Sequence, residues 1–109
     1  MTLPESRAVV TLCLMAAFVD GDKHARERDE VKRIAEGLAQ AGEELNLQSL
    51  YQDVLMKRVS MADQSAALGS GEARQLAYEM AVCVCDADGA QSPTEQRFLD
   101  ELRSALGLD

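Results

Sequence analysis

The chain alternates between mostly apolar segments and amphipathic segments whose apolar positions follow helical spacing. In the first apolar segment, 9–19, Thr11 is the only polar residue, and a helix that is apolar on every side must be surrounded by protein. The second apolar segment runs from Leu76 to Cys85 and follows the same pattern. Short apolar runs are also compatible with buried strands, but the span 72–87 is too long for a typical strand. The pattern therefore predicts two central helices.

A polar loop and then an amphipathic segment follow each apolar segment. The apolar positions of the amphipathic segments are Val31, Ile34, Ala35 and Leu38 in the first, and Phe98, Leu99, Leu102 and Leu106 in the second. Ser92 as N-cap, Pro93 at the first helical position and Glu95 closing a capping box predict where the second of these helices begins. The first copy keeps only Glu27 of this signal, because His24 stands in place of the serine.

The two halves of the chain are copies of one pattern. At an offset of 68 residues, the matching residues include Asp20 with Asp88, Gly21 with Gly89 and Glu27 with Glu95. We therefore expect an all-α fold, a compact bundle of five to seven helices in one domain, 1–109. Its halves, 5–42 and 72–109, are expected to be related by a pseudo-two-fold and joined by the helical segment 43–71.

The joining segment carries helical signals of its own. Leucines and valines at helical spacing predict an amphipathic helix over 45–55, and a shorter one is expected over 61–68. Gly42 and Gly107 are placed to end the second helix of each copy, since glycine is the residue most favoured just beyond a helix C-terminus.

The chain is acidic, with 11 Lys and Arg against 19 Asp and Glu and a net charge of −8 at pH 7. Nucleic acids and anionic membrane surfaces attract clusters of basic residues, so these partners are not expected. Hydrophobic residues make up 47% of the chain, but there are only two Tyr, two Phe and no Trp, which predicts an aliphatic core. The apolar run 9–19 is shorter than the roughly 20 residues that span a bilayer, so membrane insertion is not expected either.

Cys13, Cys83 and Cys85 are odd in number and lie in apolar runs, unlike the framework of a secreted disulfide-rich domain. We expect all three to be buried as small hydrophobic side chains in a protein of the reducing cytoplasm. His24 is the only histidine, which excludes zinc sites built from several histidines.

The repeated acids are the most informative candidates for a site. Each Asp follows an apolar helix, whose C-terminal end has unpaired carbonyl oxygens and a negative dipole and therefore attracts cations. A hard ion such as Ca²⁺ takes about six to eight oxygen ligands, more than one loop supplies, so the two loops would have to share it. Either loop alone differs from an EF-hand, because Val84 and its counterpart Ala16 occupy the first ligand position. The same spacing also fits a structural role, in which the Glu residues only cap helices and Asp-Gly only forms turns. The candidate ligands are Asp20, Glu27, Asp88 and Glu95.

Two motifs resemble the signature halves of TerB-like domains of the tellurite-resistance family. They are the segment 16–21 with Glu27, and the segment 85–95 followed by Phe98-Leu99 and Leu106-Gly107-Leu108. The resemblance extends over about 7–108 and is closer in the second half. It implies an all-helical domain in which the two acidic loops meet, and a metal-binding role for Asp20, Glu27, Asp88 and Glu95.

The function that this resemblance implies is a non-enzymatic scaffold or sensor module in a bacterial stress response. Its ligand would be a divalent cation, Ca²⁺, Mg²⁺ or Mn²⁺, and it would act on a protein partner that can be membrane-associated. Two other functions remain as alternatives, a purely structural interaction module without metal and a metal-dependent hydrolase. The hydrolase is the weaker of these, because the chain offers no candidate nucleophile and no histidine base beside the clustered acids.

Overall fold

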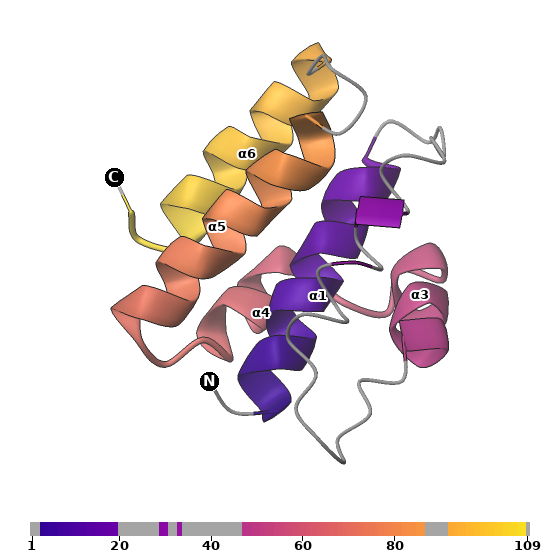
Figure 1. The fold of residues 1–109 in the computed structure, drawn as a ribbon, viewed down its shortest axis with the longest axis horizontal. Coiled ribbons are helices and arrows are strands. Elements are labelled where there is room, and N and C mark those ends of the chain that lie inside the picture. Colours follow the sequence, from indigo (N-terminus) through magenta and orange to yellow (C-terminus); the bar gives the residue numbers. More distant parts are fainter. Residues whose placement is uncertain (1–2, 20–28, 31–32, 34–46, 87–91, 109) are drawn as a thin grey trace.

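A computed structural model describes residues 3–19, 29–30, 33, 47–86 and 92–108 of the chain. The elements in this part are α1 (Leu3–Phe18), α3 (Leu47–Leu55), α4 (Met61–Ala66), α5 (Gly71–Asp86) and α6 (Pro93–Ala105) (Figure 1). These residues include no strand, which confirms the expected all-α fold. Both helices predicted for the joining segment are present, as α3 and α4.

Helix α1 lies at the centre and contacts α3, α4, α5 and α6. The apolar run predicts this position, because a helix without a polar face cannot lie at the surface. Its fully buried side chains include Val9, Val10, Leu12, Cys13 and Ala16. The buried hydroxyl of Thr11 keeps a hydrogen-bond partner, since its Oγ1 donates to the carbonyl oxygen of Arg7 at 2.7 Å. The core is therefore aliphatic, as the composition predicts.

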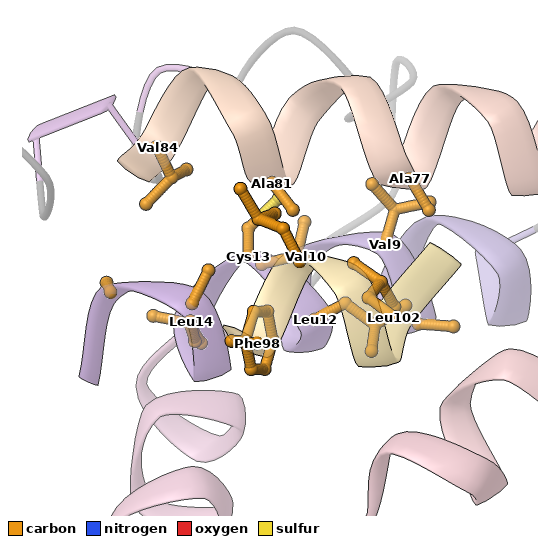
Figure 2. Close-up of a cluster of buried hydrophobic side chains, with 14 of the residues drawn as sticks. Val9, Val10, Leu12, Cys13, Leu14, Ala77, Ala81, Val84, Phe98 and Leu102 are labelled. Atoms are coloured by element: carbon orange, nitrogen blue, oxygen red, sulfur yellow. The ribbon is translucent and has the colours of Figure 1, made fainter. Parts of the chain in front are cut away.

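Helix α5 packs along α1 in the same direction (Figure 1). At the interface Ala77 lies opposite Val9, and Ala81 lies opposite Cys13 (Figure 2). All four side chains are fully buried. Alanine has no atoms beyond Cβ, so the two helix backbones approach closely here.

Helix α5 differs from α1 on its outer side, and the sequence-based expectation of a second fully surrounded helix is wrong. The exposed residues of α5 include Gln75, Glu79, Cys83 and Asp86. Positions three or four residues apart lie on one face of a helix, so these residues form a continuous outer face. Glu79 marks this face in the sequence, but Cys83 one turn later does not, because a cysteine counts as apolar whether it is buried or exposed.

The side chain of Arg74 on α5 connects the C-terminal ends of two helices, α4 and α6, that are distant in sequence. Its Nε donates to the carbonyl oxygen of Leu68 at 2.9 Å, just after α4. Its Nη1 donates to the carbonyl oxygen of Leu106 at 3.4 Å, just after α6. The backbone N–H of Gly69 in turn donates to Oε2 of Glu5 on α1 at 3.3 Å. These bonds fix the positions of α4, α5 and α6 at the end of the molecule opposite to the C-terminus of α1.

Helices α3 and α6 end in the same way, with a residue of positive φ. At the end of α6 this residue is Gly107, with φ 71°, and Leu108 N–H donates back to the carbonyl oxygen of Arg103 at 3.0 Å. The predicted role of Gly107 is thereby confirmed. At the end of α3 the equivalent residue is Lys57, with φ 56°, and Arg58 donates back to Asp53 at 2.8 Å. A side chain in this left-handed conformation costs about 1 kcal/mol, so the sequence does not predict a lysine here.

Candidate functional site

The loops that carry the repeated acids begin at one end of the molecule. Helices α1 and α5 pack side by side and run in the same direction, so their C-terminal residues, Phe18 and Asp86, point toward the same end (Figure 1). Both C-terminal ends contribute unpaired carbonyl oxygens and the negative end of a helix dipole. The acidic loops thus start from a region whose backbone favours cations.

Three of the four candidate ligands, Asp20, Glu27 and Asp88, lie outside the described residues. Within the described part of the chain, no group of three His, Cys, Asp or Glu side chains is placed to hold a metal ion. The predicted ligand set therefore stays a prediction, and Glu95 is the member whose surroundings the structure describes.

Glu95 forms the capping box that its spacing predicts. The carboxylate oxygen Oε1 accepts from the backbone N–H of Ser92 at 2.9 Å, and the backbone N–H of Glu95 donates to Oγ of Ser92 at 3.1 Å. Pro93 occupies the first turn of α6. The Glu95 side chain is only 4% exposed. Its capping role is thereby confirmed, and the bond to Ser92 uses one of the two oxygens of the carboxylate.

An EF-hand arrangement around the second loop is contradicted by the length of α5. The helix continues through Asp86, so the residues that would open an EF-hand loop are helical. Val84, at the position of the first ligand, is fully buried in the core. Ala16, the equivalent residue in the first copy, is fully buried within α1. Val84 and Ala16 are therefore not placed to act as cation ligands.

The cysteines do not share one environment, and the expectation that all three are buried is wrong for Cys83. Cys13 and Cys85 are fully buried, whereas Cys83 is exposed on the outer face of α5. Burial raises the pKa of the Cys13 thiol far above its usual range, since desolvation disfavours the thiolate. The nearby Cys83 adds to this effect. Residues two apart on a helix point in nearly opposite directions, which separates Cys83 from Cys85.

We expect a thiol reagent at neutral pH to label one cysteine in the native protein, Cys83. The thiolate is the reactive species, and a thiol that is buried with a raised pKa rarely forms it. Mass spectrometry after brief labelling should show one adduct, and the Cys83→Ser variant should show none until denaturant is added. Rapid labelling of Cys13 or Cys85 in native protein would contradict their burial in the α1 and α5 interface.

The described helices form an α-helical domain built around one buried helix, and an acidic stretch of sequence follows each of two neighbouring helices. The family model of the tellurite resistance protein TerB matches residues 6–109, and the chain belongs to this family. No curated protein and no solved structure matches the chain. Among the described helices, none has the length and apolar character needed to cross a membrane.

Proposed function

We propose that this TerB domain is a non-enzymatic module that binds a divalent cation, Ca²⁺, Mg²⁺ or Mn²⁺, between its two acidic loops. The ligands in this proposal are Asp20, Glu27, Asp88 and Glu95. The observation that carries the proposal is the parallel packing of α1 and α5, because it starts both acidic loops at one end of the molecule (Figure 1). The bound ion would make the domain a scaffold or sensor in a stress response of the tellurite-resistance type.

The repeated sequence pattern supports a shared site between equivalent loops. At two pairs of positions related by the offset of 68, both residues are fully buried: Val9 with Ala77, and Cys13 with Ala81. Figure 2 shows each of these pairs facing across the interface. In this proposal a pseudo-two-fold would run between α1 and α5. It would bring the two Asp-Gly motifs to equivalent places around one axis.

The chemistry of the proposed ligands suits a hard cation. Four carboxylates offer up to about eight oxygen atoms, which is the range that Ca²⁺ prefers, and Mg²⁺ or Mn²⁺ would use fewer together with water. A net charge of −8 raises the local concentration of cations at the surface. The ion would act structurally in this proposal, since its ligands come from both halves and would hold them together. A protein partner, free or membrane-associated, would then recognise the ion-bound form.

A purely structural module is the second candidate, and the capping box favours it. Oε1 of Glu95 is already used by the Ser92 N–H, which explains the presence of this glutamate without any metal. The same explanation would extend to Glu27 by the repeat. The two candidates differ in how the protein responds to added cation.

We expect the wild-type protein to unfold at higher temperature when Ca²⁺, Mg²⁺ or Mn²⁺ is added after treatment with a chelator. An ion that binds only the native state adds about 1.4 kcal/mol at ten times its Kd. Glu95→Gln should unfold at the same temperature as wild type in chelator, because glutamine still accepts the Ser92 hydrogen bond. When the ion is present, it should unfold at a lower temperature than wild type. Asp20→Asn and Asp88→Asn should show the same conditional loss.

The matched control for this test is Glu101→Gln, the same substitution at an exposed position of α6. It should leave the response to the ion unchanged. If both loops hold one ion, the double variant Asp20→Asn with Asp88→Asn should lose less of the stabilisation by the ion than the two single variants lose in sum. The structural module would be established instead by two results together. Glu95→Gln would lower the unfolding temperature equally in chelator and in cation, and none of the three ions would raise the unfolding temperature of wild type.

A further inference from the structure

An apolar groove lies between the C-terminal ends of α1 and α3 and the first turns of α6. Its volume is about 310 Å³. The apolar side chains that line it are Met15, Phe18, Val19, Val54, Val59 and Phe98. Lys57 is the one charged residue among the described lining residues. A mostly apolar depression with a single placed charge is typical of small-molecule sites, whose volumes begin at about 300 Å³.

The wall between α1 and α3 is held by an aromatic pair. The rings of Phe18 and Tyr51 meet edge to face, with centroids 5.0 Å apart and an interplanar angle of 89°. This geometry is the favoured one for two aromatic rings. The contact with Tyr51 therefore restrains the Phe18 ring, which lines the groove.

The backbone fixes Lys57 at the groove. Its own N–H donates to the carbonyl oxygen of Val54 at 3.1 Å, and the next N–H, of Arg58, donates to Asp53 at 2.8 Å. These two bonds hold Lys57 in the left-handed conformation that favours glycine. Lys57 therefore combines a strained backbone with a place in the lining of the groove, and strain of this kind suggests a purpose other than ending the helix.

The charges around the groove favour an anionic ligand. Arg58 lies with Nη1 3.6 Å from Oδ1 of Asp53, so part of its charge is compensated. Within the described part of the chain Lys57 has no such carboxylate partner. Leu55 and Met56, which lie between the lining residues Val54 and Lys57 in the sequence, are the two large hydrophobic side chains of the described residues that are exposed, at 42% and 65%.

We propose that this groove binds a small amphiphile, a carboxylate with a short unbranched apolar tail, whose head group contacts the Lys57 ammonium. A helical peptide would need a longer groove, because its anchors are spread over two turns. A second copy of this chain would need a much larger buried area than a groove of about 310 Å³ offers. The site lies between α1, α3 and α6, and its described lining includes none of the four proposed cation ligands.

The test compares three probes with the same tail and different heads: octanoate, octyltrimethylammonium and octanol. Titrations are followed by methyl NMR in a chelator, so that no divalent cation pairs with the carboxylate. The methyl signal of Met15 should shift with octanoate, while that of Met80 on α5 should not. Octanoate should bind about fivefold or more tightly than octyltrimethylammonium, because Lys57 attracts one head group and repels the other.

Lys57→Gly is the decisive variant, since it removes the ammonium and relieves the left-handed backbone, so the protein should fold at least as well. The affinity of this variant for octanoate should be about fivefold lower than that of wild type, and equal to the affinity of wild type for octanol. Arg58→Ala, which removes the neighbouring charge that does not line the groove, should bind octanoate as wild type does. Equal binding of the anionic and cationic probes, unchanged octanoate affinity of Lys57→Gly, or no shift of Met15 with any probe would overturn the proposal.

Discussion

Replacing Leu102 with alanine is expected to lower the free energy of unfolding by about 3 kcal/mol. Leu102 is fully buried on the inner side of α6, where it meets the interior that α1 and α5 form (Figure 2). Removing three carbon atoms there forfeits their burial and leaves a cavity, and such leucine substitutions cost about 2–5 kcal/mol. Urea unfolding followed by circular dichroism measures the loss.

The matched control is Leu55→Ala, because it makes the same change at a side chain that is 42% exposed. Surface substitutions change the free energy of unfolding by no more than about 0.5 kcal/mol, and the loss at a partly exposed leucine should be only slightly larger. The difference between the two variants isolates the contribution of burial. Losses of equal size would contradict the packing of α6 against the core.

The helices of this fold are predictable where the signals are local. The apolar run around Leu12 predicts a buried helix, and the spacing of Ser92 and Glu95 predicts the start of α6 to the residue. Gly107 likewise marks the end of α6. Each of these signals depends on residues within one or two turns of one another, so a single sequence contains the information.

The features that the sequence did not predict depend on contacts between distant segments. Arg74 joins the ends of α4 and α6 by hydrogen bonds to carbonyl oxygens, and any arginine could do so wherever the fold brings such oxygens near. Cys83 lies in an apolar run, but its exposure follows from which side of α5 faces α1. The groove beside Lys57 combines residues of three helices, so it exists only once these helices are packed.

For the candidate site the sequence predicts residue types, and Glu95 is the one member whose surroundings the structure describes. The spacing of Glu95 from Ser92 fits both a capping box and a cation ligand, and the structure confirms the first of these roles. Parallel packing of the two repeated helices was not evident from the spacing, since antiparallel packing would place their C-terminal ends far apart. This direction is the feature that makes a shared site possible.

The close approach of α1 and α5 leads to a second large effect. Replacing Ala81 with leucine is expected to cost about 3 kcal/mol, because a fully buried alanine opposite Cys13 has no room for three more carbon atoms (Figure 2). The helices must separate or tilt to admit them. Thermal or urea unfolding should show the loss, and Ala105→Leu, at an exposed position of α6, should change stability by less than about 0.5 kcal/mol.

The same variant distinguishes a shared cation site from two separate ones. If one ion is held between the loops that follow α1 and α5, moving these helices apart should also weaken the stabilisation that the ion gives to wild type. Two independent sites would keep that stabilisation, since each loop would move with its own helix. Unfolding of Ala81→Leu is therefore measured in chelator and in saturating cation, with Ala105→Leu as the control. A full cation response in Ala81→Leu, despite its lower stability in chelator, would show that the spacing of α1 and α5 does not set the geometry of the site.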